Sequence, residues 1–278
     1  MGAVAEAEPQ ERVVELPAPS LEVPRVLPVR SLSASSLAKW ERCQATWKTS
    51  YVDRRFEPQK LNMTAGKAYG GTLAAYFEAR IDGEPMSAPD ADDRLLAEFD
   101  QELRETKLYS EDDPEKVREQ CREPLRVYLE EVAPEIRPIS VERTVRARFP
   151  GAEWSFVGYP DLETEEGLVI DHKLGEKHVF TDRAYKDVQV RSYLLCRWLE
   201  GHPARFAFHS ARLGEIKSGP RLKAVPDDPV EMTKKGLVLF QARIARAFEL
   251  DEWDENPHGW WCNSHCPAHA TCPGPNLT

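Results

Sequence analysis

The sequence contains no apolar run long enough to cross a membrane, and its first residues lack the basic and apolar regions of a secretory signal. We therefore expect a soluble, cytoplasmic protein with no membrane partner. Cysteine is also scarce, at 6 of 278 residues. Without a secretory signal a disulfide framework is disfavoured, and clustered cysteines in such a chain more often bind metal.

Length and composition predict one elaborated domain. With 278 residues and 41% hydrophobic side chains, the chain can bury a full core. Residues 1–30 are rich in Glu, Pro and Ala without helical or strand periodicity, which predicts a flexible leader. We expect residues 31–278 to form the domain, with a helical region at 31–135, a catalytic core at 136–215, and a helix and cysteine cluster at 229–278.

The formal net charge of −10 does not exclude a nucleic-acid partner, because the acidic residues are concentrated in one segment. Thirteen acidic and three basic residues lie between Asp82 and Glu115, and they account for the whole imbalance. The remainder of the chain is neutral on average and can carry basic patches. The acidic segment itself is interpreted as a solvated surface, or as an arm that repels duplex DNA or docks a partner.

Basic and aromatic residues alternate in the N-terminal helical region. The basic residues are Lys39, Arg42, Lys48, Arg54, Arg55, Lys60 and Lys67, and the aromatic residues are Trp40, Trp47, Tyr51 and Phe56. This mixture suits single-stranded nucleic acid, whose bases stack while its phosphates pair with cations. The alternative is that the aromatics belong to the core, and we favour it for Trp40 and Trp47. The residues selected as DNA-binding candidates are Lys48, Arg54 and Arg55, together with Arg146 and Arg148 of a predicted strand.

Two predicted strands bring two carboxylates and one ammonium to a single point. The first strand is closed by Asp161, and the second contains Asp171, His172 and Lys173 after an apolar run. Alternate residues of a strand share a face, so Asp171 and Lys173 project together while His172 points away. The polar residues 163–167 predict a turn that pairs the two strands.

This arrangement favours a metal-dependent phosphodiesterase site. Two carboxylates, with water and a phosphate oxygen, suit Mg²⁺ or Mn²⁺ better than a soft metal. The ion lowers the pKa of a bound water, and a nearby ammonium stabilises hydroxide or phosphate charge. The alternative is that Asp161 is a turn residue and that Asp171 and Lys173 form an ion pair at a solvated strand end. For the triplet Asp171-His172-Lys173 taken alone, this alternative is the preferred interpretation.

The flanking elements strengthen the catalytic interpretation. Upstream, residues 141–149 alternate as a strand that carries Glu142. Downstream, residues 184–199 have helical spacing, which places Gln189 and Tyr193 one turn apart. This succession resembles the PD-(D/E)-x-K nuclease superfamily, in particular its RecB-like branch, in which a Gln-x-x-x-Tyr helix follows the D-x-K strand. The resemblance covers roughly half the chain in order and register.

The resemblance implies an α/β, restriction-endonuclease-like fold, with a mixed sheet flanked by helices and a cysteine-rich, metal-binding C-terminal tail. It also implies that Asp161, Asp171 and the backbone carbonyl of His172 hold Mg²⁺ or Mn²⁺, that Lys173 serves the attacking water, and that Gln189 and Tyr193 position Lys173 or the DNA backbone. Family members commonly carry a metal-holding histidine where this sequence has Gly70. Glu78 and Glu142 are the candidates for replacing it.

The second group of candidate ligands lies near the C-terminus. Cys262, Cys266 and Cys272 leave a tetrahedral or cubane site one ligand short. Candidates for the fourth ligand are Cys43, His258, His265 and His269. The resemblance implies a [4Fe-4S] cluster held by Cys43, Cys262, Cys266 and Cys272, although the first tail spacing is one residue longer than is usual in the family. A Zn²⁺ site is the alternative, and Cys121 and Cys196 are interpreted as buried structural thiols.

The function implied is that of a metal-dependent hydrolase of DNA phosphodiester bonds. It is most like the CRISPR-associated RecB-type exonucleases and their phage relatives, acting 5′→3′ on single strands or ends in a prokaryotic or phage-infected cell. A recombination or CRISPR-adaptation protein is the partner class implied. Two alternatives stay open: a catalytically impaired DNA-binding or assembly subunit, and a zinc-stapled structural protein.

Overall fold

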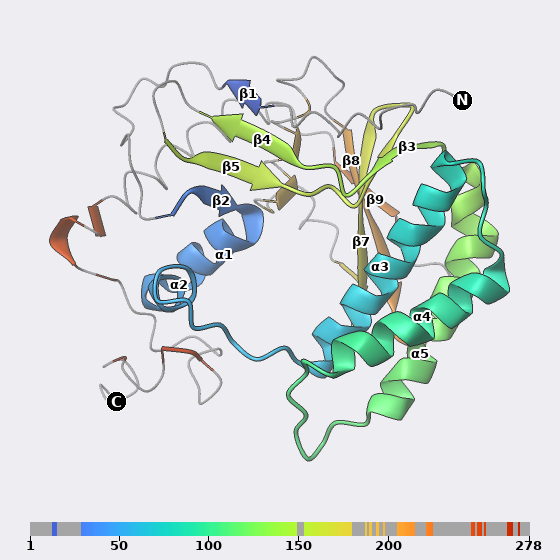
Figure 1. The fold of residues 1–278 in the computed structure, drawn as a ribbon, viewed down its shortest axis with the longest axis horizontal. Helices are drawn as coiled ribbons and strands as arrows, with labels where there is room; N and C mark the ends of the chain where they lie inside the picture. Colours follow the sequence, from blue (N-terminus) through green and yellow to red (C-terminus); the bar gives the residue numbers. More distant parts are fainter. Residues whose placement is uncertain are drawn as a thin grey trace, which may run out of the picture.

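The fold is built from two mixed sheets with helices on both sides, seen in a computed structural model of the chain (Figure 1). The residues described are 13–15, 29–148, 153–179, 187, 189–190, 193–194, 197, 205–214, 221–224, 246–247, 249–251, 253, 266–268 and 272. The predicted α/β fold of mixed sheet and flanking helices is therefore confirmed. The predicted helix within residues 229–250 lies mostly outside the described residues, as does Cys262.

The two sheets have the strand orders β1-β4-β5-β2 and β3-β6-β7-β8-β9. The first sheet contains β1 (Val13–Glu15), β2 (Ser31–Ser33), β4 (Val145–Arg148) and β5 (Ser155–Gly158). The second contains β3 (Pro138–Val141), β6 (Leu162–Thr164), β7 (Leu168–Gly175), β8 (Arg205–Arg212) and β9 (Arg221–Ala224). In the second sheet β7 is central, pairing antiparallel with β6 and parallel with β8. β1 lies in the segment for which the sequence predicts no regular element.

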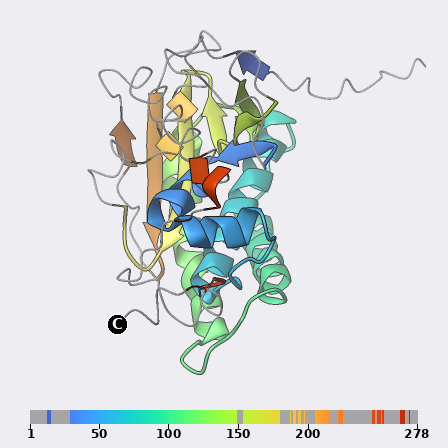
Figure 2. The same ribbon diagram turned by 90° about the vertical axis from the view of Figure 1, so that its left-hand side faces the viewer.

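The helices form two groups. Helices α1 (Ala34–Arg42) and α2 (Gln44–Tyr51) lie on one side of the sheets and face the viewer in Figure 2. Helices α3 (Leu61–Ile81), α4 (Ala88–Leu103) and α5 (Pro114–Val127) lie on the other side (Figure 1). A π-helical turn at Tyr128–Val132 continues α5. Side-chain caps begin three of these helices: Ser33 for α1, Ser87 for α4 and Asp113 for α5.

Strand β7 separates the hydrophobic core into two parts. Val169 packs into the cluster that contains Trp40 and Trp47, whereas Ile170 packs into the cluster that contains Phe77. Because successive strand residues point to opposite faces, Asp171 follows Val169 toward one cluster and His172 follows Ile170 toward the other. Trp40 and Trp47 are both buried, which confirms the core interpretation of these two aromatics.

Two details of the predicted strands are wrong. The continuous strand expected over residues 141–149 is divided between β3 in one sheet and β4 in the other. Glu142 lies at the break, with a left-handed φ of 45°, and its backbone N–H donates to the Asp161 carbonyl at 3.2 Å. Asp161 does not close a strand; it links β5 of one sheet to β6 of the other. The local alternation could not indicate that the chain changes sheets.

A buried ion cluster anchors β6, the strand that follows Asp161. The Glu163 carboxylate accepts hydrogen bonds from Arg143, from Ser140 at 2.8 Å, and from Arg197 at 3.3 Å. The Glu163 and Arg197 side chains are only 3% and 4% exposed. Arg197 lies one turn beyond Tyr193, so the cluster ties β6 to the helical residues that carry Gln189 and Tyr193.

No helix in the described part of the chain is long and apolar enough to span a membrane.

Burial of Phe77 predicts a large stability effect at that position. Phe77 is 1% exposed, whereas Met63, on the same helix, is 53% exposed. We expect Phe77→Ala to lower the free energy of unfolding by about 3–5 kcal/mol, because it leaves a cavity in the core. Met63→Ala should change it by no more than about 0.5 kcal/mol in the same urea titration. Equal effects of the two substitutions would contradict this packing.

The ion cluster predicts a pH-dependent contribution to stability. Burial alone raises the pKa of Glu163, but hydrogen bonds from Arg143 and Ser140 and the charge of Arg197 outweigh it and lower that pKa. The stabilisation is therefore complete above the unfolded-state pKa of about 4.3 and is lost as the pH falls through the lower folded-state pKa.

We expect Glu163→Gln to cost about 3 kcal/mol at neutral pH, since it leaves the buried Arg197 and the partly buried Arg143 without their counter-charge. The gap from wild type should stay constant between about pH 5 and 7 and narrow below about pH 4. The exposed Glu165, paired loosely with Arg137 at 3.7 Å, provides the matched Glu165→Gln control. A gap that widens on acidification would rule out this account.

Candidate active site

Strand β7 presents Asp171 and Lys173 on one face. Asp171 is fully buried and forms an ion pair with the ammonium of Lys173, whose side chain is 31% exposed. The Lys173 ammonium also lies 5.8 Å from the centroid of the Phe208 ring on the neighbouring strand. The structure therefore brings these two predicted residues together, with the carboxylate buried and the ammonium reaching solvent.

Asp161 docks onto the same strand from the link between the sheets. Its Oδ2 accepts a hydrogen bond of 2.7 Å from the backbone N–H of His172. Burial and the nearby charge of Asp171 both raise the pKa of Asp161 well above its usual range, against the opposing charge of Lys173. Two carboxylates that disfavour each other's ionisation thus lie close together, at the start of β6 and on the central strand β7.

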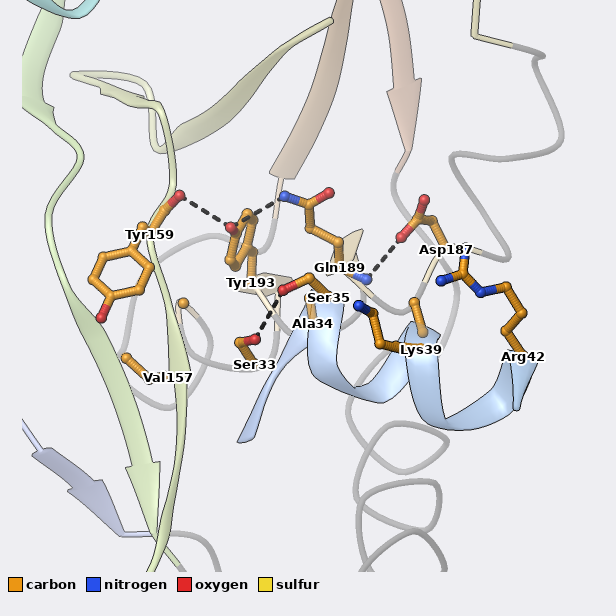
Figure 3. A pocket seen from close by; sticks show the side chains of 12 residues that line it. Ser33, Ala34, Ser35, Lys39, Arg42, Val157, Tyr159, Asp187, Gln189 and Tyr193 are labelled. Carbon is orange, nitrogen blue, oxygen red and sulfur yellow. Dashed lines mark hydrogen bonds between the residues drawn. The ribbon is translucent and has the colours of Figure 1, made fainter. Parts of the chain in front are cut away.

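Gln189 and Tyr193 connect the helical segment to both carboxylate-bearing segments. Gln189 Nε2 donates to Asp171 Oδ1 at 2.7 Å and contacts Tyr193 Oη at 3.2 Å. Tyr193 Oη donates to the Tyr159 carbonyl at 3.0 Å, two residues before Asp161 (Figure 3). The predicted one-turn spacing is confirmed, and Gln189 contacts Asp171.

His172 lies on the opposite face of β7, as the alternation predicts. Its Nε2 lies 2.8 Å from Tyr128 Oη, which is also 2.8 Å from Nδ1 of His209. Burial, followed by the charges of His209 and Lys173, lowers the pKa of His172 well below its usual value. The neutral His172 ring therefore packs on the face of β7 away from Lys173, while the His172 backbone N–H donates to Asp161.

The donor set suits a hard divalent cation. Adjacent, partly buried carboxylates are the oxygen ligands that Mg²⁺ and Mn²⁺ prefer, and their mutual repulsion is relieved by a cation. Glu142 is near enough for its charge to raise the pKa of Asp161, whereas Glu78 lies near the end of α3. Within the described ranges no group of three or more metal-ligating side chains occurs, so neither glutamate completes such a group there.

Gly70, where the resemblance implies a histidine, lies within α3. A Cβ atom at this position would meet no atom within 4 Å. The glycine is therefore not required by close packing.

Of the predicted cysteine ligands, the structure places Cys43 and Cys266 next to α2. Cys43 is buried at the junction of α1 and α2, and Cys266 Sγ lies 3.3 Å from Thr46 Oγ1 on α2. Cys266 is thus close to α2 despite lying 220 residues from Thr46. The Cys272 backbone N–H donates to the Ala268 carbonyl. Among the residues that the structure describes, these thiols form no group of three ligands, and Cys262 lies outside that set.

The predicted DNA-binding residues are dispersed. Lys48 is 3.6 Å from Asp251 and lies over the Trp253 ring, and Arg54 and Arg55 are exposed after α2. On β4, Arg146 Nη1 donates to Ser155 Oγ at 3.4 Å, and Arg148 is exposed.

A cavity of about 480 Å³ adjoins Gln189 and Tyr193 instead. Its lining includes Lys39 and Arg42, which the sequence placed in the basic region but did not single out (Figure 3). Their i, i+3 spacing on α1 was the available signal. The sequence could not show that this face of α1 lies near the segment that carries Gln189 and Tyr193.

Comparisons with known proteins agree with this fold. The family model described as "PD-(D/E)XK nuclease superfamily" matches residues 31–273. The crystal structure of a protein named "Putative exonuclease", from Eubacterium rectale, superposes with a TM-score of 0.55 at 13% sequence identity, covering 84% of this chain and 87% of that chain. At that identity the likeness is one of fold. No curated protein sequence matches the chain. Because the family model spans most of its length, the chain belongs to the PD-(D/E)XK nuclease superfamily.

Proposed function

We propose that the chain is a Mg²⁺- or Mn²⁺-dependent deoxyribonuclease that cuts phosphodiester bonds at single strands or DNA ends. The observation that carries the proposal is the convergence on Asp171: Lys173 pairs with its carboxylate and Gln189 donates to it, while Asp161 binds the next backbone N–H. The preference for exonuclease action with 5′→3′ polarity rests on the resemblance to RecB-type exonucleases. That resemblance also suggests a recombination or CRISPR-adaptation partner in the cytoplasm.

Each residue has a distinct role in this proposal. Asp161, Asp171 and the His172 carbonyl would hold the divalent ion, with Glu142 as the nearer additional carboxylate. When bound, the ion supplies Lewis acidity and a water of lowered pKa. Lys173 places a positive charge where hydroxide attacks and phosphate charge builds. Gln189 orients the Asp171 carboxylate, and Tyr193 holds Gln189 against the Tyr159 backbone. Burial raises the pKa of Tyr193, so its hydroxyl remains a hydrogen-bond donor.

Substitution of the two β7 residues tests the nuclease proposal. Lys173→Met should reduce cleavage of end-labelled single strands with Mn²⁺ by about 100–1000-fold, the usual loss when one preorganised charge-stabilising donor is removed. Asp171→Asn should abolish detectable cleavage, and chelation of the metal should abolish cleavage by wild type. The matched controls are Lys107→Met and Asp100→Asn, which alter α4 and its following loop and should cut like wild type. Full activity of the Asp171 or Lys173 variant would refute the proposal.

The alternative of a catalytically impaired DNA-binding subunit is supported by Gly70, which supplies no ligand side chain. Calorimetric titration of Mn²⁺ into wild type and Asp161→Asn separates the two functions. A nuclease should bind Mn²⁺ and cut DNA, and Asp161→Asn should lower both the affinity for Mn²⁺ and the rate of cleavage. The non-catalytic alternative requires DNA binding without cleavage by wild type at saturating Mn²⁺.

We also propose that Cys43, Cys262, Cys266 and Cys272 hold a [4Fe-4S] cluster, with Zn²⁺ as the alternative occupant. The position of Cys266 beside Thr46 supports this, because it links the tail to the helix that follows Cys43. Such a long-range link would stabilise the fold as a loop-closing crosslink does. A zinc-stapled structural role without nuclease activity remains the second alternative function.

Metal analysis of anaerobically purified protein tests the cysteine proposal. Cys266→Ser should lose most of the bound iron and sulfide and should lower the melting temperature. The control is Cys121→Ser, since Cys121 is buried, donates to the Val117 carbonyl, and has a pKa raised to about 12 by burial. That variant should retain the metal. Stoichiometric zinc without iron or sulfide would establish the alternative occupant, and the absence of both metals would overturn the proposal.

A further inference from the structure

The cavity beside the candidate active site lies between the first helix and the Gln189–Tyr193 segment (Figure 3). Its volume of about 480 Å³ is within the range of small-molecule binding pockets. Gln189 lines the cavity and donates to Asp171, so the cavity adjoins the carboxylates. Whatever occupies it is therefore next to the proposed scissile bond.

One wall of the cavity is cationic and rich in hydroxyl groups. Lys39 and Arg42 lie one turn apart on α1, and Ser33 and Ser35 stand at the start of the same helix. Among the described lining residues Asp187 supplies the carboxylate, and its Oδ1 accepts the Gln189 backbone N–H at 2.8 Å. In a chain of net charge −10, a wall of two cations and two hydroxyls favours an anion with several oxygen atoms.

The two cations are held in place by a nearby carboxylate. Arg42 Nη2 donates to Glu57 Oε1 at 3.2 Å, and Lys39 Nζ lies 3.8 Å from the same oxygen. Lys39 also donates to Ser50 Oγ at 3.1 Å. Glu57 is not among the residues that line the cavity, so it neutralises the cations from behind. A phosphate entering the cavity would compete with Glu57 for them.

The opposite wall offers an aromatic surface. Tyr159 lines the cavity and is 50% exposed, although its neighbour Pro160 is buried. Its backbone carbonyl is held by Tyr193 Oη, which fixes the chain at this position. An exposed tyrosine that lines the same cavity as two cations is a combination suited to single-stranded nucleic acid, since bases can stack on the ring while phosphates meet the cations.

We propose that this cavity is a subsite for single-stranded DNA next to the cleavage site, with a backbone phosphate at Lys39 and Arg42 and a base stacked on Tyr159. The inference rests on the proposed nuclease function and adds to it the residues that select single strands. A stacked duplex cannot present an unpaired base to Tyr159, so the subsite accounts for a preference for single strands or frayed ends.

Fluorescence anisotropy of a labelled oligothymidylate, measured with full-length protein in EDTA, tests binding without cleavage. Lys39→Gln and Arg42→Gln should each weaken binding and make the dependence of log affinity on log salt less steep, by about 0.7 when the two are combined, the value for one phosphate contact on single strands. Tyr159→Ala should weaken binding by about five-fold or more, whereas Tyr159→Phe should bind like wild type. Arg126→Gln, which alters an exposed cation paired with Glu123 on α5, is the remote control.

Glu57→Gln is expected to increase the affinity for single strands, a change that misfolding would not produce. Removing the competing carboxylate should strengthen single-strand binding, whereas a purely structural Glu57 predicts no gain. An unchanged salt slope in both cation variants, or no gain in Glu57→Gln, would overturn the subsite. If wild type cuts DNA and these variants bind normally, the nuclease proposal stands without the subsite. If wild type binds single strands but does not cut them, and the substitutions weaken that binding, the subsite stands and the nuclease proposal fails. If wild type does not bind single strands, the subsite is overturned.

Discussion

The buried carboxylate of Asp171 is the constraint on which the candidate site depends. A charge without solvent costs several kcal/mol unless opposite charges and hydrogen-bond donors surround it. Lys173 supplies the charge from the same strand, and Gln189 supplies a donor from a distant helical segment. The bond from Gln189 also holds the helical segment against β7. The requirements of one ionised group therefore organise the surrounding structure.

Strand β7 can carry this group because its two faces have different environments. On the face of His172, the hydroxyl of Tyr128 joins two buried imidazoles behind the strand. On the face of Asp171, the neighbouring strand contributes Phe208 and the helical segment contributes Gln189. The rear network is enclosed, and its His172 ring is neutral, whereas the front is charged and opens to solvent through Lys173. This asymmetry places reactive groups at an accessible surface of a rigid sheet.

A second buried carboxylate, Glu163, connects the same elements from further away. It fixes β6 directly after Asp161 and binds Arg197, one turn after Tyr193. The two carboxylate centres therefore link the inter-sheet segment and the helical segment at two points. Such double anchoring restricts the relative movement of the groups in the candidate site. The hydrogen bond from Tyr193 to the Tyr159 carbonyl lies between these two segments, and both tyrosines line the cavity.

Local periodicity by itself determined the shared face of Asp171 and Lys173, the opposite orientation of His172, and the one-turn pairing of Gln189 with Tyr193. These are consequences of the two-residue repeat of a strand and the 3.6-residue repeat of a helix. The tertiary structure alone decided the break at Glu142, the inter-sheet position of Asp161, the pairing of Glu163 with Arg197, and the position of Lys39, Arg42 and Tyr159 around one cavity. Those features join segments far apart in the chain, and their geometry follows from packing two sheets and two helical groups around separate cores.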